Sequence, residues 1–182
     1  MNSGDCNFGD NCGKPQVCKE VTPGGFRECA GPPLEATMCD NMFDKCCSSA
    51  ECTTPAKCLE TPLVPKCGGP FALKHNECAS DECSSDADCA AMGPAICTIA
   101  GTLDRKIRAC LPVACLKDVD CTAEPGGICA PVIEPCCTGV SGMYCVYPSD
   151  GCRANADCPQ DYHCGVSNGR ASCLAGTIPC PL

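Results

Sequence analysis

Residues 152–173 read CRANADCPQDYHCGVSNGRASC, and their four cysteines follow the spacing C-x5-C-x5-C-x8-C. The last two cysteines, Cys164 and Cys173, lie symmetrically around Asn168-Gly169. This dipeptide favours a tight β-hairpin, because both central positions of such a turn need a positive φ. The segment therefore predicts a compact turn that is followed by a two-stranded hairpin.

Similar four-cysteine units recur along the whole chain. The first gap always holds five residues, the second holds five or seven, and the third holds eight to fifteen. Successive units start 40, 37, 32 and 37 residues apart, a period that is typical of a tandem array. The disulfide framework is expected to consist of Cys6, Cys12, Cys18 and Cys29; Cys46, Cys52, Cys58 and Cys67; Cys83, Cys89, Cys97 and Cys110; Cys115, Cys121, Cys129 and Cys145; and Cys152, Cys158, Cys164 and Cys173. The simplest crosslinking pairs the first cysteine with the third and the second with the fourth, although four cysteines permit three pairings.

The cysteine content sets the fold class. The chain has 26 cysteines among 182 residues, whereas Leu, Ile, Val and Phe together number 28, too few for an ordinary core. The alternatives are a disulfide framework and a metal–thiolate cluster. Zinc sites use short pairs such as C-x2-C with histidine partners, and the chain has no such pair and only His75 and His163. We therefore expect disulfides, no metal and no cofactor, in an extracellular or cell-surface protein, because persistent disulfides need an oxidising compartment.

Six cysteines lie outside this framework. They are Cys39, Cys47, Cys78, Cys136, Cys137 and Cys180, and they lie in the connectors, in the enlarged hairpin of the fourth unit and at the C-terminus. These positions make them candidates for bridges between repeats or between subunits. The alternative is pairing within the chain, which the even number of cysteines favours.

The expected fold is small and disulfide-rich: a tandem array of short turn-plus-β-hairpin units with little regular secondary structure. The units span residues 1–38, 39–78, 79–111, 112–148 and 149–182, with the first two including their connectors. Turn residues place hairpin tips at Pro23-Gly24-Gly25, at Ala100-Gly101 and at Asn168-Gly169. Short connectors that contain proline predict a stiff, elongated row of units.

The first two connectors are longer and more apolar than the others. Leu34, Phe43, Phe71 and Leu73 are available there to pack between units or against a neighbouring molecule.

The invariant first gap carries a short polar residue directly before the second cysteine. This residue is Asn11, Glu51, Asp88, Asp120 or Asp157 in the five units. Such side chains accept backbone N–H groups and close a turn. The alternative is calcium binding through Asp86 with Asp88, or through Asp118 with Asp120. Turn capping is favoured, because a calcium loop needs six or more oxygen ligands and these pairs supply few.

The spacing resembles three groups of small disulfide modules: the cysteine-rich half of Dickkopf proteins, part of the WAP four-disulfide core, and short tandem cysteine repeats of large bacterial surface proteins. The WAP pattern C-x2-D-x2-C is met by Cys83-Asp86-Cys89 and by Cys115-Asp118-Cys121. The following Cys97 and Cys129 depart from it, because they come at a different gap and are not doubled. The resemblance implies a secreted or surface protein, and it transfers no protease-inhibitory loop.

No catalytic site is expected. Nucleophilic catalysis needs a serine or cysteine beside a histidine base, and Ser141 in GVSG lacks the G-x-S-x-G pattern. His75 and His163 are expected to be ordinary surface or packing residues. The net charge of −9 argues against nucleic acid, and no apolar window of about 18 residues exists for a membrane span. Residues 1–6 have neither the basic start nor the apolar run of a secretion signal, so we expect a targeting segment to have been removed.

Two classes of function fit this description, and the first is favoured. The first is a structural subunit that stacks with copies of itself, unit five against unit one, into an open filament or coat outside the cell. The second is a secreted protein-binding module or protease inhibitor that presents variable hairpin loops. The expected partner is the chain itself in the first class and another extracellular protein in the second.

Overall fold

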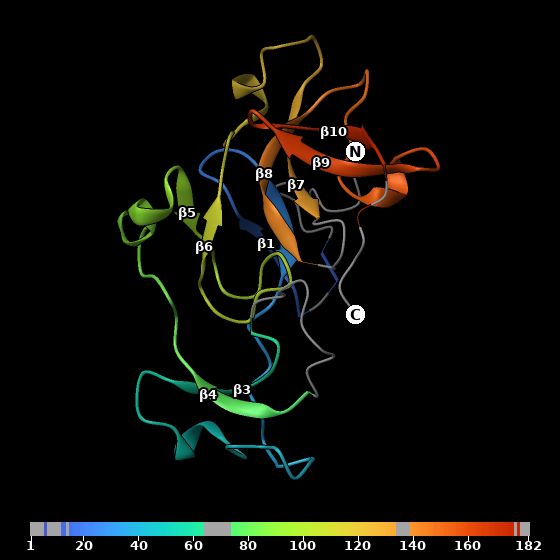
Figure 1. Cartoon of the computed structure of the whole chain (residues 1–182). Helices are drawn as coiled ribbons and strands as arrows, with labels where there is room; N and C mark the ends of the chain where they lie inside the picture. The colour runs from blue at the N-terminus through green and yellow to red at the C-terminus, as the bar shows by residue number, and fades with distance from the viewer. Residues whose placement is uncertain are drawn as a thin grey trace.

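The computed structural model describes residues 6, 12–13, 15–63, 74–133, 139–176 and 178. In these ranges the regular structure consists of short strands and short 3-10 helices (Figure 1). The strands are β1 (Val17–Glu20), β2 (Arg27–Ala30), β3 (Lys57–Glu60), β4 (Asn76–Ala79), β5 (Ala95–Cys97), β6 (Cys110–Pro112), β7 (Ile128–Ile133), β8 (Val140–Val146), β9 (Tyr162–Ser167) and β10 (Arg170–Ala175). The 3-10 helices are η1 (Ser49–Glu51), η2 (Asp86–Met92), η3 (Asp118–Asp120) and η4 (Asn155–Asp157).

Each unit contains one antiparallel hairpin, and this confirms the predicted fold class. The pairs are β1–β2, β3–β4, β5–β6, β7–β8 and β9–β10. In every pair a cysteine lies directly opposite another cysteine, as Cys164 lies opposite Cys173. Strands β4 and β6 each extend one residue beyond the expected unit ends at 78 and 111.

Two of the three expected hairpin tips are found. Asn168 and Gly169 have φ values of 50° and 76° and reverse the chain between β9 and β10, and Gly24, with φ of 66°, lies in the reversal between β1 and β2. Ala100 and Gly101 do lie in a turn, with φ of 86° at Gly101, but they form no tight hairpin tip, because β5 ends at Cys97 and β6 begins only at Cys110. The intervening loop 98–109 folds back on itself instead, with Thr98, Thr102 and Arg105 buried.

Units four and five form one four-stranded sheet in the order β7-β8-β10-β9. The join is parallel: Arg170 and Ala171 of β10 pair with Cys145 and Val146 of β8. A backbone hydrogen bond from Cys145 N to Gly169 O, 3.0 Å long, reinforces it. The short connector between units four and five therefore links two parts of one sheet and is not a linker between separate units.

The main core is shared by units one, three and four, so the expected elongated row is wrong. Phe26 of unit one packs in one cluster with Ile96 and Leu111 of unit three and with Met143 of unit four. The Thr22 hydroxyl also donates a 2.7 Å hydrogen bond to the carbonyl oxygen of Leu116 in unit four. Each unit has too few apolar side chains to enclose a core alone, and folding the units together buries them.

Unit two lies apart from this assembly. Figure 1 shows β3 and β4 below the region that contains β1 and β5 to β10. We call residues 34–63 and 74–79 the arm, and the other described residues, from units one, three, four and five, the body. The arm has its own small cluster of Leu59 and Ala79, which is completed by Ile107 from the loop 98–109 of unit three.

Candidate functional site

Eleven disulfides link the described cysteines, none of which is free. In the four units of the body the first cysteine is bonded to the third and the second to the fourth. These bonds are Cys6–Cys18 and Cys12–Cys29, Cys83–Cys97 and Cys89–Cys110, Cys115–Cys129 and Cys121–Cys145, and Cys152–Cys164 and Cys158–Cys173. The predicted crosslinking therefore holds throughout the body.

Unit two departs from this prediction at its fourth cysteine. Cys46 is bonded to Cys58 as expected, but Cys52 is bonded to Cys78 and not to Cys67. The physical reason is the strand register: the fourth cysteine must lie opposite the third across the hairpin, and Cys78 lies opposite Cys58. Cys67 lies outside the described residues.

The prediction for the six cysteines outside the expected framework also needs correction. Cys39 is bonded to Cys47 within unit two, and Cys78 belongs to the framework of that unit. These three residues therefore bridge neither repeats nor subunits, because their partners lie beside them in the folded arm. The other three, Cys136, Cys137 and Cys180, lie outside the described residues.

The polar residue before the second cysteine caps the turn, as predicted. The Asp120 carboxylate accepts the backbone N–H groups of Leu116 and Lys117 at 2.8 and 3.0 Å, and these bonds lower its pKa. Asp157 accepts the equivalent N–H groups in unit five. Bonds from the Ser84 hydroxyl and from the Ser84 and Ser85 N–H groups lower the pKa of Asp88 to about 2.

Glu51 makes a similar contact in the arm, where its carboxylate accepts the Cys47 N–H at 3.2 Å. Asn11 lies outside the described residues.

A second capping position was missed in the sequence. Three positions before the second cysteine, a side-chain oxygen accepts the backbone N–H of the third cysteine, at 2.8 to 3.0 Å. The acceptors are Ser49, Asp86, Asp118 and Asn155, and the donors are Cys58, Cys97, Cys129 and Cys164. All four acceptors are short polar side chains at one repeat position, and this pattern could have revealed them. The carboxylates that were considered for calcium are therefore bonded to backbone N–H groups.

The other residues considered for chemistry take part in ordinary hydrogen bonds. His75 Nδ1 lies 3.2 Å from the Thr61 hydroxyl in the arm, and His163 Nδ1 lies 2.8 Å from the Gly176 carbonyl oxygen in unit five. The Ser141 hydroxyl donates to the Val132 carbonyl at 2.9 Å. In each unit three cysteine sulfurs lie within 4.8 Å of one another, but all of them belong to disulfides, which lack the thiolate that binds zinc.

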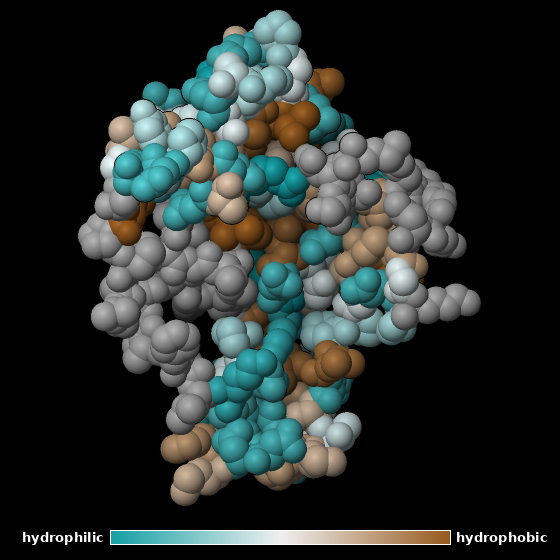
Figure 2. Space-filling model, turned by 90° about the vertical axis from the view of Figure 1, so that its right-hand side faces the viewer, coloured by the Kyte–Doolittle hydropathy of each residue, from teal (hydrophilic) through white to brown (hydrophobic). Residues whose placement is uncertain are grey.

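The arm exposes an unusual amount of apolar side chain. Leu34 is 90% exposed, Met42 88%, Met38 62% and Phe43 53%. Leu34 and Phe43 therefore do not pack between units, whereas Phe71 and Leu73 lie outside the described residues. Figure 2 shows hydrophobic surface in the lower part of the molecule, where Figure 1 places the arm, on both sides of a hydrophilic stripe.

The backbone beneath these apolar side chains is firmly held. The Cys39–Cys47 bond closes a small loop around Met42 and Phe43. Inside this loop, the Asp44 carboxylate accepts the N–H groups of Asp40 and Asn41 at 2.7 and 2.9 Å.

Further bonds attach the loop to the start of β4. Asp44 also accepts the Asn76 N–H at 2.7 Å, and this bond is the main reason that its pKa is lowered. The Asn76 side chain, which is only 6% exposed, donates to the Met38 carbonyl at 3.1 Å. The exposed apolar side chains therefore project from an ordered backbone.

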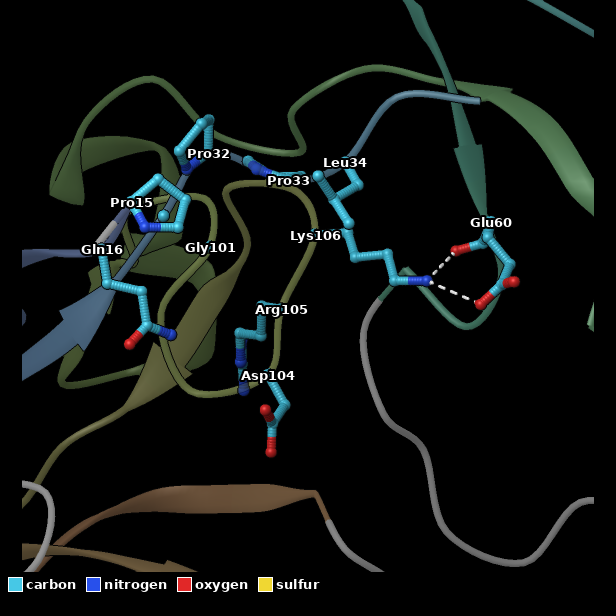
Figure 3. A pocket seen from close by; sticks show the side chains of 11 residues that line it. Pro15, Gln16, Pro32, Pro33, Leu34, Glu60, Gly101, Asp104, Arg105 and Lys106 are labelled. Atoms are coloured by element: carbon cyan, nitrogen blue, oxygen red, sulfur yellow. Dashed lines mark hydrogen bonds and ion pairs between the residues drawn. The ribbon is translucent and has the colours of Figure 1, made fainter. Parts of the chain in front are cut away.

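A hollow of about 560 Å³, the junction pocket, lies where the arm meets units one and three. Figure 3 shows Pro15, Pro32 and Gln16 on one side, Lys106 on the other, and Arg105 and Asp104 between them. Pro33 and the exposed Leu34 form its upper edge in this view. Leu34 thus belongs both to the lining of this pocket and to the exposed apolar side chains of the arm.

The basic side chains of the junction pocket have partners within the protein. Lys106 Nζ donates to the Glu60 backbone carbonyl at 2.5 Å and lies 3.4 Å from the Glu60 carboxylate. Lys74 lies 3.2 Å from the same carboxylate, and these two lysines lower the pKa of Glu60. Arg105 is buried and directs its guanidinium to the carbonyl oxygens of Cys110 and Val140.

A second hollow, of about 580 Å³, lies between units four and five beside Arg170. The guanidinium contacts Glu124 at 2.7 Å, pairs with Asp150, and lies 4.7 Å from the centre of the Tyr147 ring. Hydrogen bonds from Ser149 and Arg170 lower the pKa of Glu124. Arg170 pairs with acidic side chains of the same protein and so helps to join units four and five. This hollow therefore offers little to a ligand.

No helix of the described residues is long and apolar enough to cross a membrane. No family model, curated protein or solved structure matches this chain. What is established is therefore a cysteine-rich chain of tandem disulfide-bonded units, and the likeness to Dickkopf and WAP modules rests on cysteine spacing alone.

Proposed function

We propose that this chain is a secreted, disulfide-stabilised module that binds another protein through its arm. The observation that carries the proposal is the exposure of Leu34, Met38, Met42 and Phe43 on a backbone fixed by a disulfide and by hydrogen bonds. A soluble protein gains nothing for its own stability from large apolar groups held in water. Exposed apolar groups that lie within one short segment, as these do in residues 34–43, favour an interaction site.

The chemistry of the arm suits protein recognition. Methionine is flexible and polarisable, so Met38 and Met42 can adapt to the shape of a partner, and Phe43 can fill a pocket. Because the Cys39–Cys47 bond already orders the loop, binding would cost little conformational entropy. The eleven disulfides indicate an oxidising, extracellular-type environment, which supports a secreted location.

The shared core favours binding over head-to-tail polymerisation. An open filament was expected from a row of units with equivalent ends, whereas unit one packs against units three and four of its own chain. Electron microscopy and sedimentation of the non-reduced protein separate the two classes. We expect a monodisperse small particle. Filaments with a regular subunit spacing would contradict the binding proposal and support a structural subunit instead.

A direct test locates the partner on the arm. A photo-crosslinking amino acid replaces Met42 in one variant and Val119 in another, because Val119 is a comparably exposed apolar residue of the body, at 76%. We expect one extracellular protein to crosslink at position 42 and not at position 119. The purified partner should then bind the native chain, and Met42→Asp should weaken the complex while Val119→Asp should not. Equal effects at the two positions would contradict the proposal.

A further inference from the structure

The loop that lines the junction pocket contains two adjacent residues in the left-handed backbone region. Leu103 has φ of 52° and Asp104 has φ of 56°, and Gly101 just before them has φ of 86°. A bulky residue such as leucine seldom adopts a positive φ, and such residues concentrate at sites where a side chain must be aimed. The Leu103 side chain is buried in the main core, and its N–H donates a 2.8 Å hydrogen bond to Glu28 of unit one.

This backbone conformation leaves the Asp104 side chain exposed at the pocket. Within the described ranges no N–H group or cation is bonded to its carboxylate. The neighbouring cations are bonded to other groups. Lys106 is bonded to Glu60, Arg105 to backbone carbonyls, and Lys19 donates to the Ala100 carbonyl at 3.1 Å. Asp104 is thus the charged group of the pocket that is available to a ligand.

A second carboxylate lies close to the loop that lines the pocket. Glu28 lies behind the loop and is partly removed from water, so that burial, and to a lesser extent the charge of Asp104, raises its pKa. When Glu28 is ionised, its charge and that of Asp104 both favour a cation in the pocket. The net charge of −9 on the whole chain acts in the same direction over a longer range.

The remaining walls are apolar. Pro15, Pro32, Pro33 and Leu34 present hydrocarbon surface to the same hollow. A ligand that fits this arrangement has an aliphatic stem that lies along the prolines and Leu34, and a positive end that reaches Asp104. Lysine and arginine side chains have this construction, since an apolar stem carries a charged tip.

We infer that the junction pocket binds a lysine or arginine side chain of the partner protein, with its charge at Asp104 and its stem against the prolines and Leu34. The inference rests on the proposed function for the identity of the partner, and it extends the binding surface from the arm into the pocket. The basic side chain would give the partner a charged anchor in addition to its apolar contacts with the arm.

The test uses small probes and the intact oxidised chain labelled with 15N. N-acetyl-lysine amide and N-acetyl-arginine amide carry the proposed group, N-acetyl-norleucine amide keeps an aliphatic stem without charge, and N-acetyl-glutamate amide reverses the charge. We expect the basic probes to shift the amide signals of Gly101, Asp104 and Lys106. Norleucine should bind about threefold more weakly, the range of a partly exposed ion pair, and glutamate should not bind.

Asp104→Asn is the decisive variant, because asparagine keeps the tolerance for a positive φ and loses only the charge. Asp161→Asn is the matched control, since Asp161 is also an exposed aspartate with a positive φ, of 66°, but lies in unit five. Asp104→Asn should make the lysine probe bind no better than norleucine, and Asp161→Asn should change nothing. Absence of shifts in the native chain, equal binding of lysine and norleucine, or an unchanged lysine affinity in Asp104→Asn would each overturn the inference.

These experiments distinguish a failure of the pocket inference from a failure of the proposed function. Probe binding at Asp104 without any crosslink at position 42 supports the basic-side-chain site and contradicts a protein partner on the arm. Crosslinking at position 42 without probe binding supports the partner and contradicts the pocket inference.

Discussion

The body and the arm are built from the same four-cysteine unit, but they treat their apolar side chains in opposite ways. In the body, Leu111 and Met143 are fully buried at the contact between units three and four. In the arm, Met42 and Leu34 are almost fully exposed although the backbone around them is bonded. The disulfides of a unit therefore fix its local shape, whereas contact with other units decides which side chains leave the water.

The largest expected difference between the two regions concerns their disulfides. Replacing Cys115 and Cys129 by alanine removes a buried bridge from the main core and should lower the free energy of unfolding by about 4 kcal/mol. Replacing Cys39 and Cys47 removes a bridge that lies largely at the surface of the arm, and about 2 kcal/mol is expected. Denaturant titration measures both values.

Hydrogen exchange supplies the control for these two variants. Loss of Cys39–Cys47 should speed exchange in the arm and leave β7 to β10 protected. If the body lost protection as well, the arm and the body would be one cooperative unit, and the contrast drawn between them would not hold.

A matched pair of methionines gives the next effect. Met143 is fully buried in the body, and Met143→Ala should cost about 3 kcal/mol, because it removes buried surface and leaves a cavity. Met42 is 88% exposed in the arm, and Met42→Ala should change stability by less than about 0.5 kcal/mol. Thermal and denaturant unfolding of both variants check this. A large cost for Met42→Ala would show that the side chain is buried in solution and would remove the main support for the binding surface.

The polar contacts between units should give a smaller effect. The Thr22 hydroxyl accepts the Phe26 N–H at 2.8 Å and donates to the Leu116 carbonyl, so it connects units one and four. Thr22→Val keeps the shape and leaves these two groups without this partner, at a cost of about 2 kcal/mol. Thr37→Val, at an exposed position of the arm, is the control and should be neutral. Equal unfolding midpoints for the two variants would contradict a role for Thr22 in docking unit one.

These regions also differ in how far sequence alone could predict them. The hairpins, the pairing within the body and the caps at Asp88, Asp120 and Asp157 follow from local rules, because the participating residues lie within one unit. The bond of Cys52 to Cys78 could not be found by counting to the nearest cysteine, since a longer hairpin of unit two sets the register. Local spacing thus predicts the pairing within the units of the body, but not within unit two, where Cys78 lies opposite Cys58.

The sequence pattern could not predict the contacts between units. The folding of unit one onto units three and four depends on shape complementarity among Phe26, Leu103 and Met143, which no periodicity records. The junction pocket depends on the same docking, and so the elongated row was expected instead. The prediction of a hairpin tip in the loop 98–109 failed for a related reason. Gly101 does turn the chain, but Thr98 and Arg105 are buried, so the loop packs against other units and is not a hairpin tip.

The smallest expected effect concerns acid, and it should affect the caps of the body. Because hydrogen bonds from Ser84 and Ser85 lower the pKa of Asp88 from 3.8 to about 2, the ionised form is favoured in the folded state. The cap is therefore fully stabilising above the unfolded pKa near 4, and its contribution is lost as the pH falls toward 2. Asp88→Asn should flatten the decline in melting temperature over this window, and Asp161→Asn should leave it unchanged. An NMR titration that gave Asp88 its ordinary pKa of 3.8 would contradict the capping bonds, and with them the view that each unit of the body is closed by its own local chemistry.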